Sequence, residues 1–504
     1  MLKKLTNGAI LADKKICCIG NSGYITEFVE KYHVEKQIIQ ILDRNPSKCG
    51  IRKVGGRDIP VVLMNQMTDE SDLILITDDY FREAYDDIHG IIGDTYGDIF
   101  YFANKETEYE EEYREKYKNA SLDDIIVFRS GPHVTEYVSG MDFYDNSRAL
   151  FEYMVERNYN KKYRMIWIVK NPENFCSYAG MHNVEFLAME WSVSDIKEER
   201  DRYYHALCLA KYIFFTDAYG FARNCREDQI RVQLWHGCGF KTRLNFVPCR
   251  KRYEYMTVTS PLYADIHAKL FGLDDSQMLV TGCAKGDWLF KGTDKDYKAL
   301  LGIPEAGKYI YWLPTYRQAK EVLAQNNGYE IGGETGLPII DSFDKMHFLN
   351  TGLRAADTIL VIKLHPYQDK SSVGNFSYSN IVLLDNEQLF TCDIQINQLL
   401  HDADALISDY SSAAVDYLML ERPVGFVMED ADAYENARGF IFEHIRDWIP
   451  GMEITSVEDF VSFVTEWEKL PEYDSERIGC IADKLQVYHD GNSCRRIVDK
   501  LGIE

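Results

Sequence analysis

The chain has 504 residues, of which 46% are hydrophobic and 27% charged, and its formal net charge at pH 7 is −24. This length exceeds what one hydrophobic core usually serves, so two or three globular domains are expected. The negative charge opposes non-specific binding to nucleic acid or to an anionic membrane, so any anionic ligand must be held by a local basic site.

The cysteines and the apolar runs bear on where the protein works. The twelve cysteines are scattered and include no C-x-x-C, which is typical of a reduced cytosol and not of a disulfide framework or a zinc site. The first fifteen residues lack the long apolar core of a signal peptide. Apolar runs such as residues 413–428 are interrupted by charges, well short of the roughly 20 residues that a spanning helix needs. We expect a cytoplasmic protein whose membrane contact, if any, is peripheral at the cytoplasmic face.

Short apolar runs alternate with amphipathic segments along the chain, which is the pattern of βαβ units and parallel sheets. Residues 14–20 predict a strand, Asn21-Ser22-Gly23 a turn, the next segment a helix, and a second strand ends at Asp43, the order of a Rossmann half. The glycine fingerprint is incomplete, so a docking module without a ligand is preferred slightly over a degenerate nucleotide-binding domain. The charged segment 105–119 predicts a connecting helix or linker.

Two larger α/β blocks follow this first one. The prediction is therefore an α/β protein with a Rossmann-like accessory domain and its linker over residues 1–119, and two Rossmann-like domains over residues 120–250 and 251–504. Predicted strands of the second block are 125–130, 163–169, 184–189, 213–217 and 231–235, and the third block begins near 253–260 and continues through MLVTG, YIYWL, TILVI, NIVLLD, DALIS and PVGFVM.

Ligands of open α/β sheets bind outside the carboxyl ends of the strands, so the residues directly after each apolar run are the candidates. These positions hold His236-Gly237, Pro314 to Arg317, Lys363 to His365, and Ser411-Ser412. Together they predict one cleft lined by cations, histidines and hydroxyls, which suits an anion with several phosphate oxygens.

The serine pair precedes the helical run AAVDYLML. Ser411 and Ser412 are therefore expected at the helix N-cap and first turn, where free backbone N–H groups favour a phosphate. Asp416 lies four residues after Ser412 on the same helix face, where it is placed to accept hydrogen bonds from sugar or polyol hydroxyls.

Four ordered motifs resemble those of the CDP-glycerol glycerophosphotransferases, the teichoic-acid polymerases and primases of Gram-positive bacteria. They are WHG followed by a lysine (235–241), LPTYR (313–317), IKLHP (362–366) and SDYSSAAVDYLMLERPV (408–424). The resemblance covers roughly residues 123–470. It implies a GT-B pair of Rossmann-like domains, with residues 120–250 on the acceptor side and residues 251–504 binding the donor CDP-glycerol.

The resemblance also implies the reaction and its partners. A glycerol phosphate unit would pass from CDP-glycerol to a hydroxyl of a lipid-linked or glycan acceptor, with release of CMP, in the synthesis of a teichoic-acid-like or capsular cell-surface polymer. No nucleic acid is implied, and neither a cofactor nor a metal is required. Catalytic roles fall on His236, as the base, and His365; substrate contacts fall on Trp235, Gly237, Cys238, Gly239, Lys285, Pro314, Thr315, Arg317, Lys363, Leu364, Ser411, Ser412 and Asp416.

The chain departs from the family pattern at two places. Cys238-Gly239 stands where the family commonly has Thr-Pro, and TGCAK (281–285) carries Lys285 in place of an arginine. The donor therefore stays open between CDP-glycerol and CDP-ribitol or another CDP-polyol. An NAD-dependent oxidoreductase driven by the first block and a non-catalytic nucleotide-binding scaffold are the alternatives from other classes.

Two acidic triplets, one cysteine thiol and one basic run also bear on the function. The D-A-D triplets at 402–404 and 430–432 are interpreted as exposed turn acids, not metal ligands. A nucleophilic thiol at Cys238 is disfavoured, because no third orienting group is apparent. The basic run 250–252 faces either an anionic acceptor or lipid head groups, or is a solvated linker.

Overall fold

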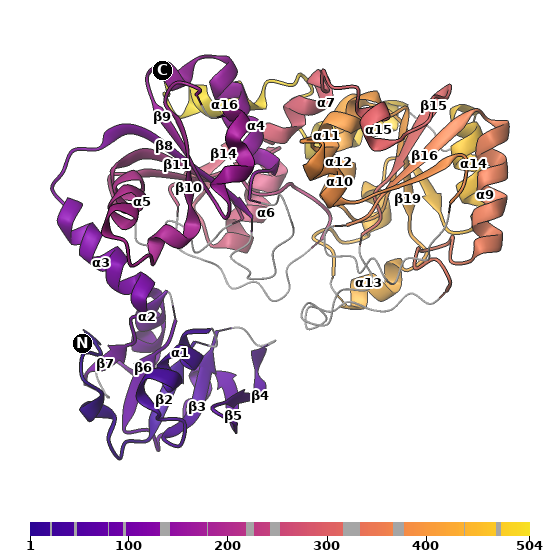
Figure 1. The fold of residues 1–504 in the computed structure, drawn as a ribbon. Coiled ribbons are helices and arrows are strands. Elements are labelled where there is room, and N and C mark those ends of the chain that lie inside the picture. Colours follow the sequence, from indigo (N-terminus) through magenta and orange to yellow (C-terminus); the bar gives the residue numbers. More distant parts are fainter. Residues whose placement is uncertain are drawn as a thin grey trace.

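The computed structural model describes residues 1–20, 23–44, 48–78, 80–93, 97–131, 142–178, 180–217, 226–241, 253–315, 333–365, 377–437, 439–469 and 475–504. These residues form three sheets, of seven, seven and six strands, and each sheet is built from one region of the chain (Figure 1). The mixed α/β architecture with parallel sheets is the predicted fold class.

The N-terminal sheet contains the predicted Rossmann-like strands. Its order is β1 (Leu2–Lys4), β7 (Ile99–Tyr101), β6 (Leu73–Ile76), β2 (Ile16–Ile19), β3 (Ile38–Asp43), β5 (Arg57–Leu63) and β4 (Gly50–Val54), with helices α1 (Gly23–Tyr32) and α2 (Phe81–Ile92). All pairings are parallel except that of β4 with β5. Gly55 and Gly56, with φ of 55° and 80°, make the turn of this hairpin, which the sequence analysis did not predict.

Helix α3 (Lys105–Tyr117) occupies the predicted connecting segment and links the N-terminal sheet to the second one (Figure 1). Asn104 caps it, because its side chain accepts a hydrogen bond from the Thr107 amide at 2.9 Å. The Tyr113 ring stacks on Tyr204 of α5 (Lys197–Leu209), with ring centroids 4.6 Å apart. The helix is therefore packed against the second block along one face, not suspended between two blocks.

The second sheet extends further along the chain than predicted. Its order is β10 (Val184–Ala188), β9 (Arg164–Val169), β8 (Asp123–Gly131), β11 (Ala210–Asp217), β12 (Ile230–Gln233), β13 (Tyr255–Val258) and β14 (Met278–Val280), all parallel. The assignment of the last two strands to the third block was wrong, because β13 pairs with β12. The expected boundary at 250/251 thus falls within this sheet. The sequence of a short buried parallel strand does not indicate which sheet the strand joins.

The third sheet carries the remaining predicted strands. Its order is β17 (Ile381–Leu384), β16 (Thr358–Lys363), β15 (Lys308–Trp312), β18 (Ala405–Ser408), β19 (Val424–Val427) and β20 (Met452–Ile454), all parallel. Helices α9 (Phe343–Ala355) and α14 (Val457–Glu466) pack against it with a shared apolar core (Figure 1).

The C-terminal helix α16 (Ser493–Lys500) returns to the second sheet, beside α4 (Asp145–Glu156) (Figure 1). Ile497 and Val498 lie in the same hydrophobic cluster as Phe128 of β8. The Asp287 carboxylate accepts hydrogen bonds from the backbone amides of Ser493 and Cys494, at 2.7 and 2.9 Å. The second and third sheets are therefore joined by a second crossing of the chain.

Within the described residues, no helix combines the length and the apolar character needed to cross a bilayer.

Candidate active site

The WHG segment forms a tight turn at the carboxyl end of β12. Trp235 has a φ of +55°, uncommon for a non-glycine residue, and its amide donates to the Gln233 side chain at 2.9 Å. Asn146, buried at the start of α4, donates from Nδ2 to the Trp235 carbonyl at 2.7 Å. The Trp235 and His236 rings lie with centroids 4.0 Å apart, and His236 itself is half-buried. The turn therefore presents the predicted base from a rigid support.

The two glycines of this turn press directly against the start of α12 (Ser412–Tyr417) in the third block. Gly237 has a φ of +129°, and a Cβ added there would lie 2.8 Å from the Ser412 Oγ. A Cβ on Gly239 would lie 3.0 Å from the Ser412 amide nitrogen and Cα. The departure at Gly239 therefore has a steric reason, because the backbone runs against the first turn of α12 with no room for a side chain.

Ser411 is the N-cap of α12, as predicted. Its backbone is extended, with φ of −75° and ψ of 145°, and its Oγ accepts from the Ala413 amide at 3.3 Å. Ser411 and Ser412 are both half-buried. Their hydroxyls thus lie at the same edge of the third sheet that receives the WHG turn.

Lys285, in the short helical turn that follows β14, is 7% exposed and surrounded by acceptors. Its Nζ donates to the His236 carbonyl at 2.6 Å and to Asp145 Oδ2 at 3.1 Å, and lies 3.5 Å from Asp416 Oδ2. Burial by itself lowers the pKa of Lys285, but Asp145 and Asp416 outweigh it and the pKa is raised. The ammonium is therefore fixed in its charged form.

Asp416 is the most isolated acid of the site. Its side chain is 1% exposed, and neither carboxylate oxygen makes a hydrogen bond to any described residue. Burial raises its pKa to about 6, with the charges of Lys285 and His236 opposing this shift and that of Asp145 adding to it. A polyol hydroxyl, the predicted partner of Asp416, reaches these oxygens only after the surrounding side chains move.

The two departures from the family pattern lie against each other. Cys238 of the WHG turn and Cys283 of TGCAK are both buried. The neighbouring Cys238 thiol, together with burial, raises the pKa of the Cys283 thiol well above its ordinary value. The pair packs as two small buried side chains between the WHG turn and the TGCAK segment.

Two residues that the sequence analysis did not select tie the LPTYR motif to the rest of the site. Asp409 accepts from the Thr315 amide at 2.7 Å and from its Oγ1 at 2.5 Å, and is itself 1% exposed. Lys241 donates to the same Thr315 Oγ1 at 2.9 Å. Both residues stand inside motifs quoted above, the lysine after WHG and the acid of SDYSS, so spacing within the motifs was the available signal. Pro314 is buried beside Thr315.

Lys363 ends β16, and its side chain is 8% exposed. Its Nζ donates to the Asn386 amide oxygen, and no carboxylate among the described residues lies within ion-pairing distance of it. Burial lowers its pKa to about 8, with Asp385 opposing the shift. Leu364 is buried and His365 half-buried. The predicted residue Arg317 and the basic run 250–252 lie outside the described residues.

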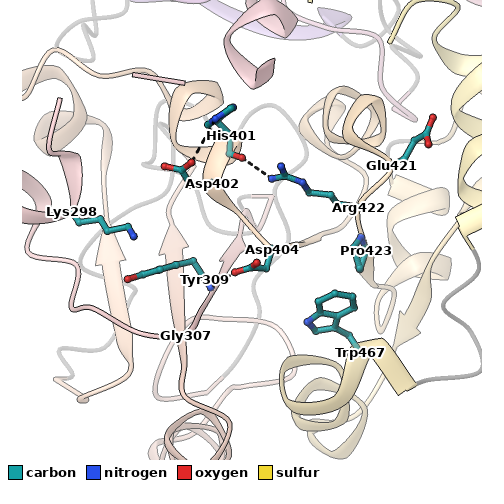
Figure 2. A pocket seen from close by; sticks show the side chains of 10 residues that line it. All are labelled: Lys298, Gly307, Tyr309, His401, Asp402, Asp404, Glu421, Arg422, Pro423 and Trp467. Carbon is teal, nitrogen blue, oxygen red and sulfur yellow. Dashed lines mark hydrogen bonds and ion pairs between the residues drawn. The ribbon is translucent and has the colours of Figure 1, made fainter. Parts of the chain in front are cut away.

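A separate open pocket of about 700 Å³ lies at the opposite edge of the third sheet, at the amino ends of β15, β18 and β19 (Figure 2). It is lined by Lys298, Gly307, Tyr309, His401, Asp402, Asp404, Glu421, Arg422, Pro423 and Trp467.

The charged groups of this pocket are largely engaged with the protein. Asp402 accepts from the Tyr297 hydroxyl at 2.9 Å, and Asp404 from the Tyr309 amide at 2.7 Å. Arg422 donates to the carbonyl of His401 at 2.6 Å. The first D-A-D triplet is thus a set of structural turn acids, and the pocket is remote from the strand ends that hold the motifs. Among the described residues, no group of three or more His, Cys, Asp and Glu side chains is arranged to hold a metal ion.

These observations define a class of protein. Two parallel Rossmann-like sheets meet through their carboxyl-end loops, which bring the WHG turn of the second sheet against Ser412 of the third. This is the GT-B arrangement, in which two Rossmann-like domains face each other. The chain belongs to the CDP-glycerol:poly(glycerophosphate) glycerophosphotransferase family, whose profile matches residues 114–502. The N-terminal sheet precedes that match.

Individual relatives agree with this assignment. A teichoic acid poly(glycerol phosphate) polymerase of Staphylococcus epidermidis is 24% identical, over 73% of this chain and 50% of its own length. A teichoic acid ribitol-phosphate primase of Bacillus spizizenii is 25% identical, over 54% of this chain and 69% of its own. The chain thus spans about half the length of the first of these relatives.

The fold also matches a solved structure. The wall teichoic acid polymerase TagF, in a histidine-to-asparagine variant soaked with CDPG, aligns with a TM-score of 0.59 and 21% identity, over 84% of this chain and 97% of that one. The predicted family and the predicted GT-B architecture are therefore both confirmed.

Proposed function

We propose that the chain transfers a glycerol phosphate unit from CDP-glycerol to an acceptor hydroxyl and releases CMP. The contact of Gly237 and Gly239 with Ser412 carries this proposal, because it brings the histidine turn of one sheet against the serine motif of the other. Family membership over residues 114–502 supports the same reaction class.

In this reaction the acceptor oxygen attacks the β-phosphorus of the donor. The new O–P bond forms in line with the bond that breaks to the bridging oxygen, CMP leaves with that oxygen, and the hydroxyl proton passes to His236. Lys363, His365 and the hydroxyls of Ser411 and Ser412 hold the pyrophosphate oxygens, and Thr315 lies beside them with its hydroxyl hydrogen bonded to Asp409. Side-chain cations and hydroxyls thus neutralise the developing charge, so the proposal includes no metal and no cofactor.

The acceptor in this proposal is a lipid-linked or glycan hydroxyl at the cytoplasmic face of the cell membrane, in the synthesis of a teichoic-acid-like or capsular polymer. The net charge of −24 favours local capture of this acceptor over a broad electrostatic attachment to the membrane. CDP-ribitol is the second candidate donor, because the ribitol-phosphate primase of Bacillus spizizenii is as similar to this chain as the glycerol-phosphate polymerase is.

The test is CMP release from CDP-glycerol and CDP-ribitol in the presence of lipid-linked and glycan acceptors. We expect release from one of the two donors, a loss of at least about hundredfold in His236→Ala, and no effect of EDTA. His182→Ala, an exposed histidine on the second block, is the matched control and should retain activity. Absence of CMP from both donors, with no cytidine-nucleotide binding, would overturn the proposal; undiminished release by His236→Ala would remove the base.

A further inference from the structure

The amino group of Lys285 has three protein acceptors within 3.5 Å. The His236 carbonyl and Asp145 accept hydrogen bonds, and Asp416 completes the set as an ion pair. These partners come from the WHG turn, from the start of α4 and from α12. An ammonium with three donors, three acceptors and 7% exposure has nothing left to offer a donor phosphate.

The same cluster holds the His236 backbone from two directions. Asn146 donates from Nδ2 to the Trp235 carbonyl, at 2.7 Å, and accepts from the Lys285 amide at 2.9 Å. The Lys285 ammonium then holds the next carbonyl, that of His236. Because this carbonyl belongs to the peptide that leads into Gly237, its direction fixes the backbone on the carboxyl side of the histidine.

The backbone of Asp145 is strained in the conformation that lets its side chain reach Lys285. Asp145 has a φ of +59°, the left-handed region, and its Oδ1 accepts from the next amide, that of Asn146, at 2.7 Å. Its Oδ2 is thereby aimed at Lys285. Asp416 lies on the other side, buried and without a hydrogen bond, so the ion pair with Lys285 is the only one that its carboxylate makes among the described residues.

We propose that Lys285 is a positioning residue, held by Asp145 and Asp416, which fixes the His236 backbone so that the imidazole meets the acceptor hydroxyl. The inference rests on the proposed function and adds to it a residue that acts through another without touching the substrate. It replaces the expectation that Lys285 binds the donor.

Steady-state CMP release by Lys285→Met tests this proposal. Misplacing a base by about 1 Å costs on the order of hundredfold, so we expect kcat to fall about ten- to hundredfold while KM for the donor stays within about twofold. Lys285→Arg, which restores the residue common in the family, should recover most of kcat. Lys291→Met, which removes an exposed ion pair with Glu156 on the neighbouring helix, is the control and should match the wild type.

The kinetic constants of these variants distinguish a positioning role of Lys285 from donor binding. A raised KM with unchanged kcat would place Lys285 on the donor and overturn the proposal, as would unchanged kcat and KM. If Lys285→Met does not fold, the isosteric Asp145→Asn removes one holder, and a fall in its kcat without a rise in KM supports the proposal. In the folded double variant, Asp145→Asn should add little to the loss caused by Lys285→Met. Failure of the wild type to release CMP from any donor would instead overturn the proposed function itself.

Discussion

Lys285 and Lys363 are both buried lysines near the carboxyl ends of strands, yet their surroundings are opposite. Lys285 is paired with two carboxylates, which raise its pKa, whereas Lys363 bonds one amide oxygen and has its pKa lowered by burial to about 8. A buried cation is costly unless it is compensated. Lys285 is therefore suited to holding structure, and Lys363, which has no carboxylate partner among the described residues, is suited to receiving an anion.

The largest effect that this comparison predicts is in Lys363→Met. Charge-assisted hydrogen bonds contribute about 1.5–3 kcal/mol, so loss of the ammonium should raise KM for the donor about ten- to hundredfold. Lys285→Met should leave that KM almost unchanged. Equal increases of KM in the two variants would erase the distinction between the lysines.

The pKa of Lys363 makes the same contrast visible as a pH dependence. With a pKa of about 8 in the free protein, Lys363 loses its proton as the pH rises through 8, and the attraction for the pyrophosphate goes with it. CDP-glycerol binding, measured by calorimetry on the His236→Ala background to prevent turnover, should weaken above pH 8. The weakening should disappear when Lys363→Met is added; a pH dependence that persists would assign it to another group.

The sequence predicted one of these two lysines better than the other. Lys363 follows an apolar run within a motif, and strand-end logic selected it and its neighbours. The partners of Lys285 were not predictable in this way, because Asp145 stands 140 positions earlier, in a segment with no motif, and reaches Lys285 through the tertiary fold. The alternation of apolar runs with amphipathic segments predicted parallel sheets. It did not predict which strands pair with each other, and β13 and β14 were therefore assigned to the third block although they belong to the second sheet.

A smaller effect is expected in Gly237→Ala, which disturbs the Lys285 side of the comparison without altering a charge. The added Cβ would meet the Ser412 Oγ at 2.8 Å and lie 3.6 Å from the Lys285 Nζ, at a φ of +129°. We expect a loss of about 1–3 kcal/mol in unfolding free energy and a fall in kcat of about tenfold. Gly302→Ala, with a φ of +66° and nothing within 4 Å of the new Cβ, isolates the conformational cost and should leave kcat intact. Equal kinetics in the two variants would show that the contact with Ser412 does not position the turn.

The smallest effect is expected in Asp416→Asn, which leaves Lys285 with one carboxylate, that of Asp145. Because the pKa of Asp416 is raised to about 6, the wild-type carboxyl is neutral below that pH, and Lys285 then already lacks this partner. The ratio of wild-type to variant kcat should be about two- to fivefold at pH 7.5 and approach one below pH 6. A ratio that does not change with pH would mean that the shape of the carboxyl matters and its charge does not.

The Asp416→Asn variant, whose kcat is expected to fall, is expected to gain thermal stability. The unfolded Asp416 ionises near its ordinary pKa of 3.8 and the folded one only near 6, so wild-type stability falls as the pH rises between these values and the full cost remains above them. Asparagine carries no such charge, and Asp416→Asn should therefore unfold at a higher temperature than the wild type at pH 7.5, with the difference vanishing below pH 4. A gain in stability joined to a loss of kcat would show that the buried acid is kept to hold Lys285, at the expense of the fold.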